Sequence, residues 1–191
     1  MGAEITQPDT NFVDIELQDK VAILSLNRAD KRNAINNDMR ADLISALDWV
    51  DRSPVVAALV LTGRGKGFCA GGDIAAMRER LSAPAERVGI NGWQRQRRTH
   101  HLLSKLHDLP KPTIAAVNGA AAGLGADLAL SCDFIIGATD TTFVMSYVLR
   151  GLIPDGGGMY FLPRRVGLAR AKELIFSGRT IGAEEAKNIN M

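Results

Sequence analysis

One repeated pattern constrains the fold of this chain more than any other. A short apolar run, rich in β-branched residues, ends at a glycine turn and is followed by a helical segment. It occurs in VVAALVLTG, residues 55–63, and again in PTIAAVNG, residues 112–119. A continuous apolar run of this length is typical of a strand buried on both faces, as in a parallel sheet covered by helices. The sequence therefore predicts an α/β fold.

The segments around these runs supply the other expected elements. Residues 12–27, FVDIELQDKVAILSLN, alternate apolar and polar residues on both sides of a turn and predict an antiparallel hairpin. Helical spacing starts at Asn36 and is ended by Ser53 and the proline that follows it. We expect further helices over residues 74–109 with a break at 82–84, over 124–133, over 168–178 and from 182 onward, and a third buried strand over 134–138.

Composition and charge exclude several classes of protein. Of the 191 residues 46% are hydrophobic and 23% are charged, which is a globular balance. The formal net charge of +2 provides no global attraction to nucleic acid or to a membrane surface. The chain has no apolar run of about 20 residues, and its start lacks the features of a signal peptide. We expect a cytoplasmic protein that binds neither nucleic acid nor membranes, with a flexible N-terminus over residues 1–11 and one domain over 12–191.

The cysteines and histidines form no recognisable metal or disulfide pattern. Cys69 and Cys132 are expected to be small buried hydrophobic residues, with a reactive Cys69 as the alternative. His100, His101 and His107 fall in one polar helical segment without a serine or cysteine partner in a motif, so we expect them at the surface. No metal site is predicted.

Two glycine-rich turns follow the buried runs, over residues 61–74 and 117–130. Both lead into helices, whose first N–H groups lack intrahelical acceptors and carry partial positive charge. Small residues there would let a substrate oxygen approach the backbone, so two converging turns would form an oxyanion hole. The alternative is that the glycines only shape tight turns. Their spacing fits neither a phosphate loop nor a dinucleotide-binding turn.

Four segments resemble, in their order and spacing, the enoyl-CoA hydratase/isomerase (crotonase) family. They are RADKRNAIN at 28–36, GRGKGFCAGGDI at 63–74, KPTIAAVNGAAAGLGADLALSCD at 111–133 and GLIPDGGGMYFLPRRVG at 151–167. The resemblance runs from about Phe12 to Asn190. It implies the crotonase (ClpP/crotonase-like) fold, which is a spiral of repeated β-β-α units.

The resemblance also implies a substrate, an oligomeric state and a further C-terminal region. The substrate would be an acyl-CoA thioester, with coenzyme A as part of the substrate and no separate cofactor. Relatives continue into C-terminal helices that cover the acyl pocket and help to build trimers. We therefore expect a homotrimer or a dimer of trimers for the complete protein, and we expect that C-terminal helical region to be missing from these 191 residues.

The same resemblance assigns the binding positions. The backbone N–H groups of Gly72 and Leu124 would hold the thioester oxygen. Many relatives have glycine at the second position, so the Leu124 side chain would reshape the acyl pocket. The residues that match the family's substrate and CoA contacts are Arg28, Lys31, Ala34, Ala70, Gly72, Asp73, Ile74 and Tyr147.

Two aspartates match catalytic positions of the family. Asp127 matches the first acid of the hydratases, and its alternative role is that of a helix-surface or capping residue. The second hydratase acid is expected where this chain has Tyr147, a departure that disfavours hydration. Tyr147 would either orient substrate or only pack. Asp155 matches the base of several isomerases and would otherwise be a turn residue.

These residues favour double-bond isomerisation among the reactions of the family. A proton would leave one carbon and return to another, while the oxyanion hole stabilises the enolate-like charge. An enoyl-CoA hydratase is the nearest alternative. A CoA-thioester hydrolase and a non-catalytic acyl-CoA-binding module are alternatives from other classes. Around Asp155 we expect an apolar pocket formed by Leu152, Ile153 and Met159.

Overall fold

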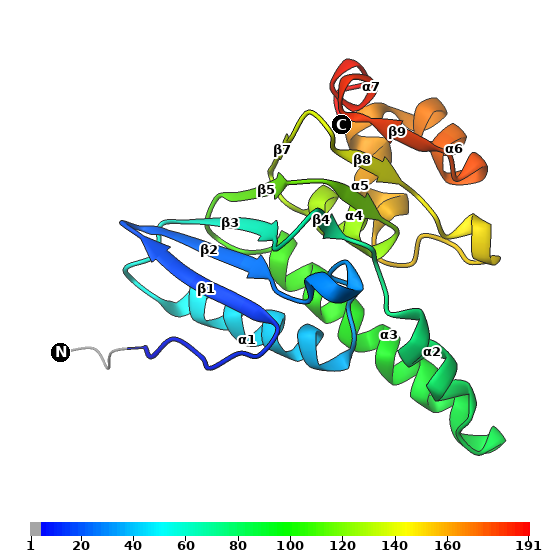
Figure 1. Cartoon of the computed structure of the whole chain (residues 1–191), viewed down its shortest axis with the longest axis horizontal. Helices are drawn as coiled ribbons and strands as arrows, with labels where there is room; N and C mark the ends of the chain where they lie inside the picture. Colours follow the sequence, from blue (N-terminus) through cyan, green and yellow to red (C-terminus); the bar gives the residue numbers. More distant parts are fainter. Residues whose placement is uncertain (1–4) are drawn as a thin grey trace.

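A five-stranded sheet lies at the centre of the computed structural model, which describes residues 5–191 (Figure 1). In sheet order its strands are β1 (Val13–Gln18), β2 (Val21–Leu26), β3 (Ala58–Gly63), β5 (Thr113–Val117) and β7 (Phe134–Gly137). The β1–β2 hairpin is antiparallel, and β2, β3, β5 and β7 run parallel to one another. The hairpin, the parallel strands and the α/β class are confirmed. β7 is the edge strand and leaves Phe134 and Ile136 each 62% exposed, so the expectation of a third buried strand over 134–138 is wrong.

The structure has a second, smaller sheet, and three of its strands follow β3, β5 and β7 in the chain. It contains β4 (Gly67–Cys69), β6 (Ala120–Ala122), β8 (Thr142–Val144) and β9 (Thr180–Gly182), in that order. Each of β3, β5 and β7 is followed by one short strand of this sheet and then by a helix. This repetition of β-β-α units confirms the predicted crotonase-type spiral. The short strands themselves were not predicted, because three residues are too few for a readable alternation.

The helices cover the sheets and connect the units. They are α1 (Asn37–Arg52), α2 (Ile74–Leu81), α3 (Ala85–His107), α4 (Leu124–Ser131), α5 (Gly158–Val166), α6 (Leu168–Ser177) and α7 (Ala183–Asn188), with short 3-10 turns η1 (Ala29–Lys31) and η2 (Val148–Arg150). Asn36 caps α1, because its side chain accepts a hydrogen bond from the N–H of Met39. The break between α2 and α3 is confirmed. Helix α5 was not predicted, since glycines precede it and Pro163 lies inside it.

The main core lies between the large sheet and the helices α1 and α3. The apolar residues that recur at helical spacing along α1 are buried, among them Met39, Leu43 and Leu47. Leu102 and Leu106 of α3 pack into the same cluster. Burial of one such side chain contributes about 1.5–3 kcal/mol, so this packing fixes the position of α3 against α1.

The N-terminal segment has hydrogen bonds to α1 although it forms no helix or strand. Within the predicted flexible terminus, residues 1–4 lie outside the described residues. The indole N–H of Trp49 donates to the carbonyl of Ile5 at 3.2 Å. The N–H groups of Asn11 and Phe12 both donate to the carboxylate of Asp42. These contacts attach residues 5–12 to α1.

Both cysteines are buried and free, as expected. Burial raises the pKa of each thiol to about 12, so neither is a thiolate at neutral pH. The three histidines are exposed. Within residues 5–191, no helix has both the length and the apolar character needed to cross a bilayer. That part of the chain also contains no group of three or more metal-ligating side chains.

Candidate active site

The two glycine-rich turns come together at the N-terminus of α4. Gly71 has φ +92°, and a Cβ atom there would lie 2.6 Å from the carbonyl oxygen of Ala122 and 3.3 Å from the amide nitrogen of Leu124. A Cβ atom on Gly125 would lie 2.2 Å from the carbonyl oxygen of Cys69. Glycine is therefore required on both sides of the contact. The first turn packs directly against the first turn of α4.

The backbone N–H groups of Gly72 and Leu124 are free at this contact. Ile35 forms a parallel bridge with Gly72, in which Ile35 donates to the Gly71 carbonyl and accepts from the Asp73 N–H. The N–H of Gly72 itself therefore faces away from Ile35. Leu124 is the first residue of α4, where helical N–H groups have no intrahelical acceptor. Neither N–H donates to another group among residues 5–191. Two free amides on adjoining turns are what an oxyanion hole requires.

Asp127 lies one turn into α4 and is completely buried. The hydroxyl of Tyr147 donates to its Oδ2 atom at 2.5 Å, while its Oδ1 atom is buried without a hydrogen-bond partner. Burial raises the pKa of Asp127 to about 7; the Tyr147 hydrogen bond lowers it and the Asp155 charge adds to the rise. The hydroxyl of Tyr147 thus contacts Asp127 rather than only filling space.

The segment from Pro154 to Gly158 covers the Asp127 carboxyl. A Cβ atom on Gly156 would lie 2.3 Å from Oδ2, and one on Gly158 would lie 2.5 Å from Oδ1. The two glycines allow the backbone to rest directly on the carboxyl. The Gly-Gly-Gly run at 156–158 is the sequence signal for this close approach.

Asp155 lies within the Pro154–Gly158 segment, and hydrogen bonds hold its backbone in place. Its N–H donates to the Ile153 carbonyl at 2.8 Å, and its own carbonyl oxygen lies 3.2 Å from Gln96 Nε2 and 2.9 Å from His100 Nε2. The side chain is half-buried, and its charge raises the pKa of both Asp127 and Tyr147. Gln96 and His100 of α3 therefore position the Asp155 backbone, a role that the sequence did not indicate.

The apolar pocket expected around Asp155 is not formed by the described residues. Leu152, Ile153 and Met159 expose 51%, 63% and 51% of their surface. They flank Asp155 in the chain, but the segment between η2 and α5 lies at the surface and turns these side chains outward. These three residues are close to Asp155 in sequence, but they do not enclose its carboxylate.

Arg28 and Asp73, two of the expected CoA contacts, are bonded to each other. The Arg28 guanidinium donates to the Asp73 carboxylate at 2.6 Å and to the Ala34 carbonyl at 2.8 Å. Asp73 also accepts from the N–H groups of Ala75 and Ala76 and so caps α2. Burial raises the pKa of Asp73, but the hydrogen bonds from Arg28 and from these N–H groups outweigh it and hold the pKa below its usual range. This ion pair joins the segment before α1 to the turn before α2.

The other expected CoA contacts lie around this ion pair. Lys31 leaves 61% of its side chain exposed and is 3.9 Å from Asp30. Ala70 and Ile74 are exposed, and Ala34 and Gly72 are half-buried. Lys31, Ala70 and Ile74 are therefore accessible, and Ala70 and Ile74 flank the turn that carries the Gly72 amide.

The chain is similar to known proteins along most of its length. The family model for enoyl-CoA hydratase/isomerase matches residues 16–190. The 1,2-epoxyphenylacetyl-CoA isomerase of Escherichia coli is 41% identical over 94% of this chain and 68% of its own length. The short-chain-enoyl-CoA hydratase of Clostridium acetobutylicum is 36% identical over 96% of this chain and 68% of its own.

A solved structure shows the same fold. The enoyl-CoA hydratase of Polaromonas sp. JS666 superimposes with a TM-score of 0.85 at 36% identity, covering 93% of this chain and 67% of that one. The chain spans between 65% and 68% of the length of the first curated relatives that it matches.

Proposed function

The chain belongs to the enoyl-CoA hydratase/isomerase family of enzymes, and on this premise we propose that it moves a carbon–carbon double bond within an acyl-CoA thioester. The observation that carries the proposal is the hydrogen bond from Tyr147 to Asp127. The resemblance expects a second hydratase acid at position 147. The chain instead has a phenol that is committed to a buried carboxyl. This leaves Asp155 as the half-buried carboxylate able to move a proton.

The proposed mechanism uses one base and two amides. The thioester oxygen accepts hydrogen bonds from the N–H groups of Gly72 and Leu124, which stabilise the negative charge as a C–H bond breaks. Asp155 takes the proton from one carbon next to the double bond and returns it to the carbon at the other end of the shifted system. No proton is gained or lost overall.

Asp127 and Tyr147 hold in place the segment that carries the proposed base, Asp155. Their hydrogen bond lies beneath the Pro154–Gly158 segment, which carries Asp155. A protonated Asp127 would also reduce the negative charge beside Asp155. Because the Asp127 carboxyl is fully buried, we assign it a positioning role that acts through its neighbours.

Several expectations remain predictions. The acyl-CoA thioester is the partner that this proposal requires, with coenzyme A as part of the substrate. Assembly of the complete protein as a homotrimer or a dimer of trimers, and a cytoplasmic location, rest on the resemblance and on the sequence.

The test is turnover of short enoyl-CoA esters by the wild type, by Asp155→Asn and by Asp140→Asn. Asp140 lies in an exposed turn and controls for loss of a carboxylate. We expect the wild type to convert 3-hexenoyl-CoA into the conjugated 2-enoyl ester. Asp155→Asn should lose at least about 100-fold in kcat with little change in CoA-ester affinity, whereas Asp140→Asn should match the wild type.

Other outcomes identify the alternatives. Unchanged kcat in Asp155→Asn would remove Asp155 from the mechanism. Loss of the enoyl absorbance of 2-hexenoyl-CoA would identify a hydratase, and release of free thiol would identify a hydrolase. Binding without any reaction would identify an acyl-CoA-binding module.

A further inference from the structure

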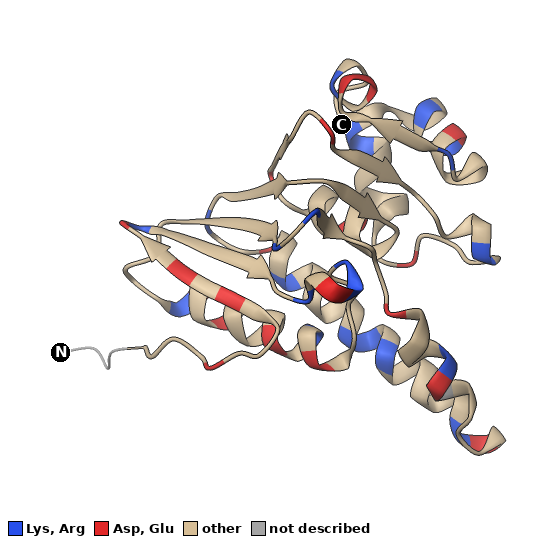
Figure 2. Cartoon of the chain, viewed as in Figure 1, with Lys and Arg blue, Asp and Glu red and all other residues tan. Residues whose placement is uncertain are grey.

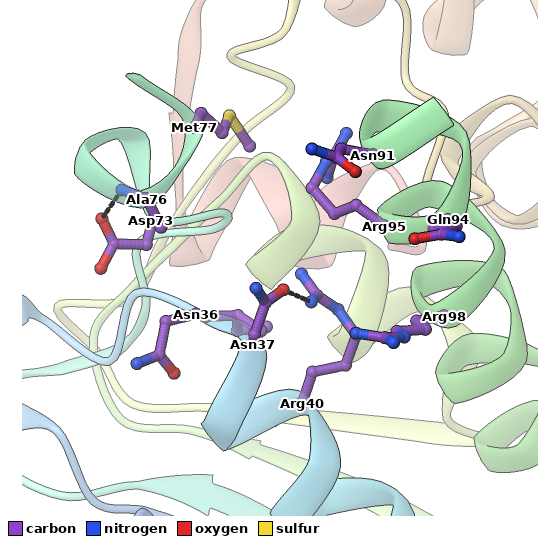
Figure 3. Close-up of a pocket in the computed structure, with 11 residues that line it drawn as sticks. Asn36, Asn37, Arg40, Asp73, Ala76, Met77, Asn91, Gln94, Arg95 and Arg98 are labelled. Carbon is purple, nitrogen blue, oxygen red and sulfur yellow. Dashed lines mark hydrogen bonds between the residues drawn. The ribbon is translucent and has the colours of Figure 1, made fainter. Parts of the chain in front are cut away.

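A cavity of about 240 Å³ lies between the N-terminal end of α1, helix α2 and the middle of α3 (Figure 3). Three arginines line it, Arg40 from α1 and Arg95 and Arg98 from α3. Figure 2 shows the basic residues of α3 where that helix passes α1. Amide side chains, among them Asn91 and Gln94, supply further polar groups. The cavity is therefore suited to a polar, negatively charged occupant.

The positive charge in this cavity has no protein counter-charge. No ion pair among residues 5–191 involves Arg40, Arg95 or Arg98. Asp73 is the one acidic residue in the lining, and its carboxylate already pairs with Arg28 and caps α2. Three guanidinium groups thus share one cavity without an anion between them.

Arg40 is the strongest evidence that an anion belongs here. It is 3% exposed, and one of its nitrogens donates to Asn37 Oδ1 at 2.8 Å. Its Nε atom and that of Arg95 are buried without an acceptor. Burial, followed by the charges of Arg95 and Arg98, lowers the pKa of Arg40 to about 10. Burying a charge without a partner is costly, and an oxyanion in the cavity would supply the missing acceptors.

The cavity adjoins the proposed thioester site. Met77 lines it, and the Met77 Cε atom lies 2.6 Å from where a Cβ atom on Gly72 would stand. Ile35, which bridges to Gly72, lines it as well. The flexible end of Met77 therefore lies between Gly72 and the cavity, and an unbranched thioether moves aside readily.

We propose that the acyl group of the substrate passes Met77 and ends in a carboxylate that is bound by Arg40, Arg95 and Arg98. The substrate class would then be the mono-CoA esters of short dicarboxylic acids. This inference rests on the proposed function, since it places the thioester at Gly72. The volume is below the range of about 300–1,000 Å³ typical of pockets for drug-sized ligands. It suits a few carbons and a carboxylate better than the nucleotide end of coenzyme A.

Calorimetric binding of three unreactive probes tests the inference. The probes are adipyl-CoA, which ends in a carboxylate, hexanoyl-CoA, which has the same chain length without it, and free coenzyme A. We expect the wild type to bind adipyl-CoA at least about tenfold more tightly than hexanoyl-CoA, as charge-assisted hydrogen bonds require. Arg95→Gln and Arg98→Gln should abolish this preference and leave the affinity for hexanoyl-CoA unchanged.

Arg97→Gln is the matched control, because Arg97 lies on the same helix but stacks over Trp93 at 4.9 Å and does not line the cavity. It should keep the preference. Since Arg98 is exposed, its variant should fold even if loss of Arg95 disturbs the protein.

Three results would overturn the inference. The first is equal affinity of the wild type for adipyl-CoA and hexanoyl-CoA, and the second is no binding of either ester. The third is an equal loss of affinity for all three probes in the variants, which would assign the cavity to the CoA phosphates. Turnover of 3-hexenoyl-CoA is measured separately. Its absence would refute the proposed isomerase while leaving the carboxylate preference to be judged by binding.

Discussion

Replacing Asp127 by asparagine should change how the stability of the protein depends on pH. The wild-type carboxyl is fully buried, and its pKa is raised from the ordinary value of 3.8 to about 7. Asparagine has the same shape and can still accept the hydrogen bond from Tyr147, but it cannot ionise. The variant therefore isolates the cost of charging one buried carboxyl.

The sign and size follow from the difference in proton binding. A carboxyl whose folded pKa is raised holds its proton more tightly in the folded state, so its contribution to stability is complete below pH 3.8. That contribution is lost as the pH rises to about 7. A shift of about 3 units corresponds to roughly 4 kcal/mol. Relative to wild type, Asp127→Asn should therefore gain up to about 4 kcal/mol between pH 4 and pH 8.

Urea denaturation at pH 4, 5.5, 7 and 8 measures this difference as the free energy of unfolding. Asp140→Asn serves as the control, because its exposed carboxylate should leave the difference from wild type nearly constant. A free-energy difference between Asp127→Asn and wild type that stays within about 1 kcal/mol over this range would refute the reasoning.

Three further substitutions test the backbone around the site. Gly71→Ala should destabilise the protein by at least about 2 kcal/mol in urea denaturation, because φ is +92° and the new Cβ atom would meet the Ala122 carbonyl. The control is Gly89→Ala, which should be neutral or stabilising because a Cβ atom there meets nothing within 4 Å. Asn33→Ala should cost about 3 kcal/mol by the same assay, since the two N–H groups of the completely buried side-chain amide are shared among three backbone carbonyls; an unchanged midpoint would contradict this. Asp73→Ala should cost about 1–2 kcal/mol through loss of the α2 cap, and a wild-type midpoint would show that the cap contributes nothing.

The parts of the fold that the sequence predicted are those set by local patterns. The apolar runs of β3 and β5 and the stripe of α1 are long enough for their periodicity to identify them. The three-residue strands of the second sheet depend on pairing with distant partners. Helix α5 carries glycines at its start and a proline inside, so its local signals oppose the helix that tertiary packing stabilises.

The site was predictable where backbone geometry defines it and was missed where distant side chains meet. The two glycine turns indicated free amides, because helix N-termini leave N–H groups without acceptors. The contact between Tyr147 and Asp127 joins residues 20 positions apart and has no local signature. The same holds for Arg40 and Arg95, since a basic run on a helix has no local feature that distinguishes a cavity lining from a solvated surface. Only the packing of α1 against α3 turns that run into a cavity lining.

The most direct test of the central claim is a crystal structure of the Asp155→Asn variant with a bound enoyl-CoA ester. We predict that the thioester carbonyl oxygen lies about 2.7–3.1 Å from the amide nitrogens of both Gly72 and Leu124. A carbonyl oxygen bound to other groups, or lying beyond about 3.5 Å from either nitrogen, would contradict the account.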